Sequence, residues 1–198
     1  MLTELHFVTG NSGKFHQLEA LTTPLDISLK QIDLNIIEPQ EDSVAEIATN
    51  KAEQAFKILQ KPLVVEDSGL YIEALHGLPG PYIKYMNTHL SLEQILDIMA
   101  GKENRACYWV STLAYANENG LITTFEDDTE RGFLTKEIYS GELSKKARSQ
   151  FWRIYISGDT GKPLAALTEA EYDSRMQEIR SQSPFMRFKS WLEQKQAA

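Results

Sequence analysis

Hydrophobic and polar positions near the N-terminus predict a strand, a tight loop and a helix. Residues 5–8 form a short apolar run, residues 9–14 read TGNSGK, and apolar residues then recur at helical spacing. Such a junction points backbone N–H groups and the positive end of the helix dipole at the loop, which favours an anion there. The spacing matches neither GxxxxGK[ST] nor GxGxxG, and a plain turn with a surface lysine is an equally open interpretation.

A second strand, an acidic segment and an amphipathic helix are predicted next. Residues 27–34 suit a strand, and residues 36–42 contain Glu38 and Glu41. Acidic loops are usually only solvated, but this one could supply metal ligands. Residues 43–59 carry an apolar stripe at helical spacing behind the capping pair Ser43 and Glu46. Lys51 falls close to that stripe, nearer than a purely solvated lysine requires.

An acid pair at the end of an apolar run is the strongest chemical signal. Residues 63–65 predict a buried strand that ends at Glu66 and Asp67, and the turn residues 77–81 (GLPGP) predict a rigid loop that no helix or central strand absorbs. Lys84 follows that loop. Because Mg²⁺ binds carboxylate oxygens together with substrate phosphates, the pattern favours an anionic ligand held through Mg²⁺.

The second half of the chain mixes helices with antiparallel strands. Helices are predicted at residues 92–99 and 169–192, the latter interrupted by Pro184, and strands at 106–116, 121–125 and 151–156, with a hairpin turn at 119–120. The acidic run 126–130 suits a solvated turn. These elements predict one mixed α/β (α+β) domain, residues 1–198, with a β-sheet core flanked by helices and two lobes around a cleft.

Composition narrows the classes of function. The 198 residues carry a net charge of −8, which argues against nucleic-acid binding by general electrostatics. The single cysteine, Cys107, excludes an internal disulfide and suggests a core residue in a reducing compartment. The sequence shows no signal peptide and no apolar run long enough for a membrane span, so we expect a cytoplasmic protein.

Four motifs occur together in one order along the chain. They are TGNxxK at 9–14, the helix around Lys51, VEDSGL at 65–70 and GLPGPYIK at 77–84, and GKPLAAL at 161–167 adds a fifth match. The chain thereby resembles the inosine triphosphate pyrophosphatase family. The resemblance implies an elongated mixed fold with a central nucleotide cleft, a homodimer, and Mg²⁺-dependent cleavage of deaminated purine nucleoside triphosphates to monophosphate and pyrophosphate.

The resemblance also assigns roles to residues. It implies a phosphate-binding loop made of Thr9, Gly10, Asn11 and Lys14, with Lys51 and Lys84 as further triphosphate contacts. Asp67 becomes the acid that binds Mg²⁺ or prepares water, with Glu66 and Ser68 beside it. Glu38 becomes the upstream metal ligand, with Glu41 as the alternative. Positive charge and a positioned nucleophile are what phosphoryl transfer to water requires.

The part of the family pattern that recognises the base is altered. Where relatives carry FGWDP, residues 149–153 read SQFWR, which leaves Phe151 and Trp152 as candidate base contacts. The family's Ser-His-Arg segment is absent from residues 173–183, where Arg175 or Arg180 could substitute, and Tyr172 stands at the place of a lysine. Loss of polar base contacts changes specificity strongly. Two alternatives follow: an enzyme with altered base preference, or a nucleotide-binding protein with little turnover.

Overall fold

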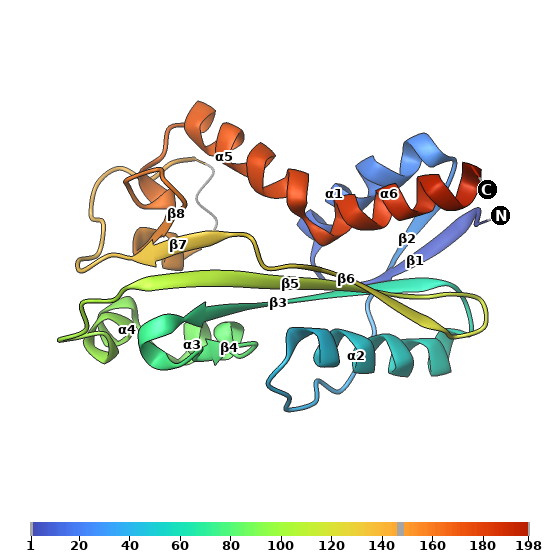
Figure 1. Cartoon of the computed structure of the whole chain (residues 1–198), viewed down its shortest axis with the longest axis horizontal. Coiled ribbons are helices and arrows are strands. Elements are labelled where there is room, and N and C mark those ends of the chain that lie inside the picture. The colour runs from blue at the N-terminus through green and yellow to red at the C-terminus, as the bar shows by residue number, and fades with distance from the viewer. Residues whose placement is uncertain (1, 146–148, 198) are drawn as a thin grey trace. The chain divides into compact units, whose positions relative to one another are not determined.

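The computed structural model describes residues 2–145 and 149–197 and shows a mixed α/β fold, as the sequence predicts (Figure 1). The strand order is β2-β1-β3-β5-β7-β8, with β4 beside β3 and β6 beside β5. The chain forms two compact units. The first contains the segments up to Ser68, Ser111–Asp127 and from Gln182 onward; the second contains Gly69–Val110 and Asp128–Ser181.

The first unit begins with parallel strands joined by helices. Strand β1 (Glu4–Val8) pairs in parallel with β2 (Ser28–Ile32) and with the start of β3 (Leu63–Ile72). Helix α1 (Ser12–Thr22) and the short helix η1 (Thr23–Leu25) connect β1 to β2, and α2 (Val44–Leu59) leads to β3. Because β1, β2 and β3 are parallel, their carboxyl ends lie at one edge of the sheet, which positions the loops that follow them.

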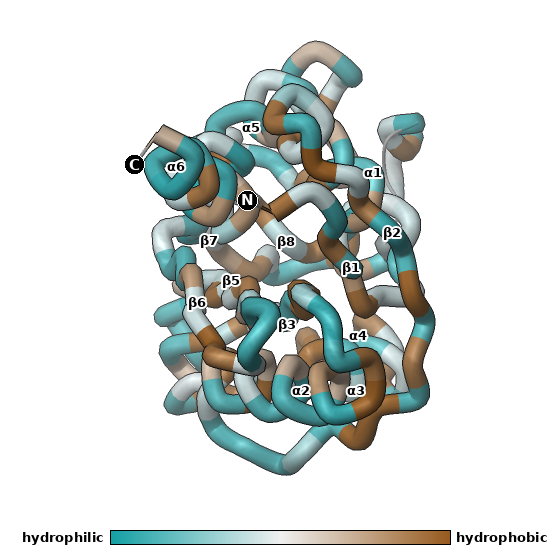
Figure 2. Tube along the Cα trace, turned by 90° about the vertical axis from the view of Figure 1, so that its right-hand side faces the viewer, coloured by the Kyte–Doolittle hydropathy of each residue, from teal (hydrophilic) through white to brown (hydrophobic). Residues whose placement is uncertain are grey.

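Helix α2 forms where the sequence places its apolar stripe. Ser43 caps the helix by accepting a hydrogen bond from the Glu46 N–H, and Gln60 ends it in the left-handed conformation with φ of 52°. Its buried face consists largely of small residues, namely Val44, Ile47, Ala48, Ala52 and Ala55. Figure 2 shows hydrophobic positions of α2 toward the strands and hydrophilic ones away from them. The small side chains allow the helix to lie close to the sheet.

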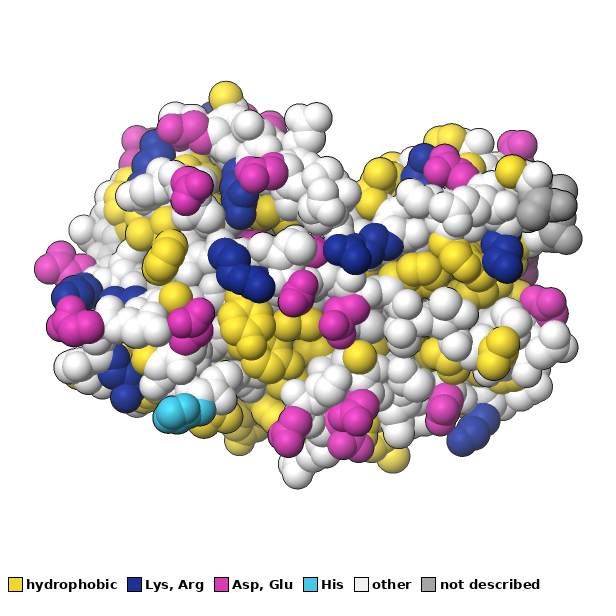
Figure 3. All heavy atoms as spheres, viewed as in Figure 1, with side chains coloured by type: hydrophobic (Ala, Val, Ile, Leu, Met, Phe, Trp, Pro, Cys, Tyr) yellow, Lys and Arg dark blue, Asp and Glu magenta, His cyan; other side chains and the backbone are white. Residues whose placement is uncertain are grey.

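Aromatic rings from three elements close the other core of the first unit. Strand β5 (Ala106–Ala116) pairs antiparallel with β6 (Ile122–Asp127), and α6 (Pro184–Ala197) ends the chain. The ring centroid of Trp191 lies 5.5 Å from that of Tyr115 and 5.7 Å from that of Phe125. In Figure 3 hydrophobic side chains gather between α6 and β6, at the right of the view. Packing of large rings of this kind contributes both burial and ring-edge interactions.

The second unit has a core of its own around the remaining strands and helices. Its elements are η2 (Glu73–Leu75), β4 (Pro79–Gly80), α3 (Ile83–His89), α4 (Leu92–Ile98), β7 (Arg131–Leu134), η3 (Gln150–Arg153), β8 (Tyr155–Ser157), η4 (Leu164–Ala166) and α5 (Glu169–Gln182). Cys107 is buried in this core, as predicted, and burial raises its pKa to about 12. No helix of the described residues is long and apolar enough to cross a membrane.

Strand β3 and the loop after it differ from the sequence prediction. The strand continues through Glu66 and Asp67 to Ile72 instead of ending at the acid pair. The GLPGP segment contains β4, whose Gly80 pairs antiparallel with Leu70 of β3. A Cβ atom at Gly69 would lie 2.8 Å from backbone atoms of Gly80, so glycine is needed for this close approach.

Two further predictions were wrong in part. Residues 151–156 do not form one strand: η3 covers Gln150–Arg153, with Ser149 accepting a hydrogen bond from the Phe151 N–H, and only β8 is extended. The acidic run 126–130 is not a solvated turn, because β6 extends to Asp127, which is buried and pairs with Arg187 at 3.6 Å. Glu130 accepts a hydrogen bond from the Tyr155 hydroxyl at 2.9 Å. A local turn capped by Ser149 explains the first difference, and partners distant in sequence explain the second.

Candidate active site

The loop between β1 and α1 is anchored at both ends by side chains. Thr9 Oγ1 accepts a hydrogen bond from the Asn11 N–H at 3.1 Å, and Gln31 on β2 donates to the Thr9 carbonyl at 2.9 Å. Gly10 is exposed, and a Cβ atom added to it would lie 3.7 Å from the Asp33 carboxylate. The loop is therefore held in place by the end of β2.

Asn11 caps the first turn of α1. Its Oδ1 accepts hydrogen bonds from the N–H groups of Gly13 at 2.9 Å and Lys14 at 3.1 Å. Asn11 thus caps two of the N–H groups that the sequence predicts for an anion, and the role of this loop as an anion site stays a prediction. The Lys14 ammonium group adds positive charge at this loop.

Lys14 connects α1 to the acid pair on β3. Its ammonium group forms an ion pair with Glu66. The Glu66 side chain is only 7% exposed, whereas that of Lys14 is 33% exposed. An ionised carboxylate with so little solvent requires a partner, and Lys14 supplies it.

Lys51 forms a second ion pair with two acids from different elements. Its Nζ atom lies 2.8 Å from Glu38 Oε1, in the segment before α2, and 3.6 Å from Asp67 Oδ2 on β3. The Lys51 side chain is 15% exposed, which confirms its position near the buried face of α2. Glu41, the alternative to Glu38, has an exposed side chain. The site thus joins α1, α2, β3 and the acidic segment within the first unit.

Burial and charge act in opposite directions on this group. Burial raises the pKa of the Asp67 carboxyl, and although Lys51 and the Ser68 N–H oppose that effect, the pKa stays above its ordinary value. Burial lowers the pKa of Lys51, but Asp67 and Glu38 outweigh it and the pKa is raised. Lys51 therefore stays cationic, while Asp67 holds a proton more readily than an exposed carboxyl.

The positions of the Glu38 and Asp67 carboxylates are compatible with a divalent cation. The Lys51 ammonium group already lies between Glu38 and Asp67, so a cation can occupy the space between these two side chains. Among the described residues no three His, Cys, Asp or Glu side chains group together as a metal site. Two carboxylates completed by substrate phosphates and water are nevertheless the usual ligands of Mg²⁺.

Lys84 belongs to the second unit. It lies in the first turn of α3, has an exposed side chain, and its carbonyl accepts a hydrogen bond from Thr88 at 2.8 Å. Its role as a triphosphate contact stays a prediction. The structure places five of the predicted charged residues in two ion-pair groups at adjacent positions of β3, namely Lys14 with Glu66, and Lys51 with Glu38 and Asp67.

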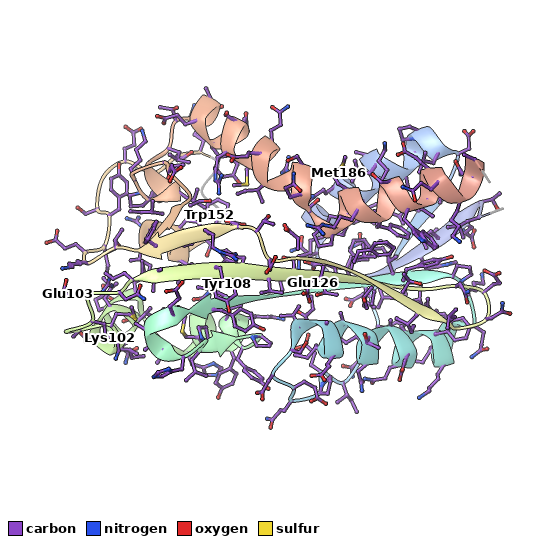
Figure 4. The ribbon with its side chains drawn as sticks, viewed as in Figure 1. Lys102, Glu103, Tyr108, Glu126, Trp152 and Met186 are labelled. Carbon is purple, nitrogen blue, oxygen red and sulfur yellow. The ribbon has the colours of Figure 1, made fainter. Side chains whose placement is uncertain are left out.

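The two aromatic candidates for the base also lie in the second unit. Phe151 is 3% exposed and lies 6.1 Å from the Tyr155 ring, so it already has a packing role in the core. Trp152, labelled in Figure 4, is half-buried and packs 5.6 Å from the Tyr172 ring. A contact of either side chain with substrate stays a prediction.

Arg175 has partners that the sequence did not reveal. Its Nε donates to Ser157 Oγ at 2.9 Å, and Nη1 lies 2.6 Å from Glu178. It lines a hollow of about 720 Å³ in the second unit, together with Thr129, Arg131 and Glu171. Arg180 is exposed near the end of α5. Ser157 carries no motif, so only the fold identifies it as a neighbour of Arg175.

Comparison with known proteins places this geometry in a family. A family model described as the Ham1 family matches residues 5–172. The chain belongs to this family. The dITP/XTP pyrophosphatase of Methanopyrus kandleri is 39% identical over 131 residues, which cover 66% of this chain and 69% of the relative. That of Saccharolobus solfataricus is 28% identical over 181 residues, 91% of each chain.

Solved structures share the family fold. The Ham1 protein of Staphylococcus aureus superposes with a TM-score of 0.77 at 22% identity, over 97% of this chain and 99% of the other. A nucleoside-triphosphatase, or dITP/XTP pyrophosphatase, from Mycobacterium abscessus gives a TM-score of 0.74 at 18% identity, over 90% and 95% of the two chains. At such identities the likeness supports the fold alone.

Proposed function

We propose that this protein is a nucleoside triphosphate pyrophosphatase that hydrolyses deaminated purine nucleoside triphosphates, such as ITP, dITP and XTP, to the monophosphate and pyrophosphate. The observation that carries the proposal is that two adjacent acids of β3 each hold a lysine from a different helix: Glu66 pairs with Lys14, and Asp67 with Lys51, which also pairs with Glu38. The relatives named as dITP/XTP pyrophosphatases support the substrate class.

The two lysines would bind the phosphates. Each ammonium group is paired with a carboxylate, and both could turn to phosphate oxygens without leaving their helices. A phosphoryl transfer needs little covalent help from the protein, because charge neutralisation and positioning lower most of its barrier. Lys14 and Lys51 supply that positive charge from two sides of β3.

Asp67 would prepare the attacking water. Burial raises the pKa of its carboxyl, so the ionised form is a stronger base than an exposed aspartate. The water would lose its proton to Asp67 while its oxygen bonds to the α-phosphorus, and the bond from that phosphorus to the bridging oxygen would break to release pyrophosphate. Glu66, the partner of Lys14, would keep that ammonium group close to the phosphates.

Glu38 and Asp67 would hold Mg²⁺. When bound, this ion neutralises phosphate oxygens and lowers the pKa of bound water. Support comes from the two carboxylates on either side of the Lys51 ammonium. We propose further that the protein is a cytoplasmic homodimer. We also propose that it binds no nucleic acid, which its net charge of −8 favours.

A panel of substrates tests the proposal. Purified protein with Mg²⁺ is incubated with ITP, dITP, XTP and the four standard triphosphates, and pyrophosphate release is followed. We expect release from the deaminated substrates. Because the base-contact motifs are altered, the alternative is a nucleotide-binding protein with little turnover. Binding of these nucleotides without pyrophosphate release would favour that alternative and contradict the enzyme proposal.

A further inference from the structure

Glu38 lies in a segment without regular secondary structure. Residues 33–43, between β2 and α2, form neither helix nor strand. The Glu38 side chain is 61% exposed, and that of Ile37 is 77% exposed. Burial of these two side chains therefore cannot fix the backbone, although the neighbouring Ile36 packs against the core of the first unit. A carboxylate that must meet a cation needs a better-defined position than such a segment provides by itself.

Gln54 provides a two-point attachment for this segment. Its Nε2 donates to the Ile37 carbonyl at 2.8 Å, and its Oε1 accepts from the Ile37 N–H at 3.3 Å. The side-chain amide thus pairs with both backbone polar groups of one residue, as a neighbouring strand does. Nε2 also donates to Asn50 Oδ1 at 2.6 Å, which steadies the amide on the surface of α2.

The attachment lies next to the ion pair on both sides. Ile37 immediately precedes Glu38, and Gln54 follows Lys51 by three residues, so the two lie on adjacent positions of one face of α2. Lys51 contacts the Glu38 carboxylate itself, whereas Gln54 holds the backbone before it. When Lys51 turns to a phosphate, Gln54 still holds the segment against α2.

We propose that Gln54 is a positioning residue that holds Glu38 in place for the divalent cation. The inference rests on the proposed function insofar as Glu38 is taken as a metal ligand.

The variant Gln54→Met tests the inference, because methionine keeps the length and helix propensity but removes both hydrogen bonds to Ile37, together with the one to Asn50. Mn²⁺ alone is titrated into the protein and free Mn²⁺ is followed by electron paramagnetic resonance. We expect the dissociation constant to rise about tenfold, in the range found when groups that orient a metal ligand are removed. The matched control is Lys57→Met, an exposed position on the same helix, which should leave it unchanged.

The Mg²⁺ dependence of pyrophosphate release gives a second readout. In Gln54→Met the half-saturating Mg²⁺ concentration should rise by the same factor, while the rate at saturating Mg²⁺ returns close to that of the wild type. The circular dichroism spectrum of Gln54→Met without metal must match that of the wild type, because bound metal can also stabilise a partly unfolded variant. If the wild type releases no pyrophosphate, the proposed function fails, but the Mn²⁺ titration still tests the role of Gln54.

Three outcomes would overturn the inference. One is an unchanged Mn²⁺ dissociation constant in a folded Gln54→Met protein, and another is an equal weakening in Lys57→Met. If Gln54→Met does not fold, Gln54→Asn serves instead, since its shorter amide cannot reach Ile37. Failure of both variants to fold would make Gln54 a residue needed for stability and would exclude the specific role.

Discussion

The Lys51 ammonium nitrogen lies 2.8 Å from Glu38 Oε1 and joins helix α2 to the acidic segment that precedes it. The same nitrogen is 3.6 Å from Asp67 Oδ2. One cation therefore neutralises two acids that the proposed reaction assigns to a metal ion. Lys51 stands where the proposed divalent cation would be needed, and in the proposed reaction it would pair with phosphate once that cation is bound.

Replacement of Lys51 separates these two roles. In Lys51→Met the acids lose their internal cation, so Mn²⁺ should bind more tightly in the absence of nucleotide. The triphosphate loses a charge-assisted contact, and its affinity should fall by about 10- to 100-fold. Isothermal titration calorimetry measures both effects, with Lys57→Met as the control. Weaker binding of both ligands would contradict the account of Lys51 as an internal cation.

The raised pKa of Asp67 predicts how stability depends on pH. A carboxyl whose pKa is higher in the folded than in the unfolded protein favours the folded state at low pH, and that contribution disappears as pH rises through the folded pKa. Asp67→Asn does not titrate. The stability of Asp67→Asn relative to the wild type should therefore increase from about pH 4 upward, where an unperturbed aspartate is half ionised.

Urea unfolding of both proteins in the presence of a metal chelator, between pH 4 and pH 7, measures this difference. The matched control is Glu53→Gln, at an exposed position of α2. Its stability relative to the wild type should change little over the same range. A difference for Asp67→Asn that shrinks with rising pH would show that the carboxyl is favoured in its ionised form and would contradict the assigned direction.

Asp127 and Arg187 make a separate prediction about stability. The Asp127 side chain is 8% exposed and lies 3.6 Å from the Arg187 guanidinium group. Arg187→Ala removes a positive charge from a buried carboxylate and should lower the free energy of unfolding by about 1–3 kcal/mol. In the control, Lys189→Ala, the lost partner is the largely exposed Glu193, and the change should stay below about 1 kcal/mol. Equal effects would exclude a special role for the Asp127 pair.

Local patterns in the sequence predict much of the fold. The stripe on α2, the hairpin around Asn119 and Gly120, and the break at Pro184 all appear in the structure, because each depends on residues close together in the chain. The end of β3 was not predictable in this way. Glu66 and Asp67 stay within the strand because Lys14 and Lys51, distant in sequence, neutralise them.

The candidate site was predicted unevenly for the same reason. Lysines, acids and glycines stand out in a sequence because they carry charge or unusual backbone freedom. Glutamines do not, so the Gln54 attachment to Ile37 and the Gln31 bond to Thr9 emerged only from the structure. From the sequence alone Asp127 cannot be distinguished from a solvated acid; the structure shows Arg187 of α6 beside it at the end of β6.

The most direct test of the central claim is the rate of pyrophosphate release from ITP by Asp67→Asn. The amide keeps the size of the side chain but cannot accept a proton or serve as an anionic ligand, so the rate should fall by a factor of about 10² to 10⁴. Nucleotide binding and the circular dichroism spectrum should be retained, and Glu53→Gln should hydrolyse ITP at the wild-type rate. An Asp67→Asn protein as fast as the wild type would contradict the assignment of this site.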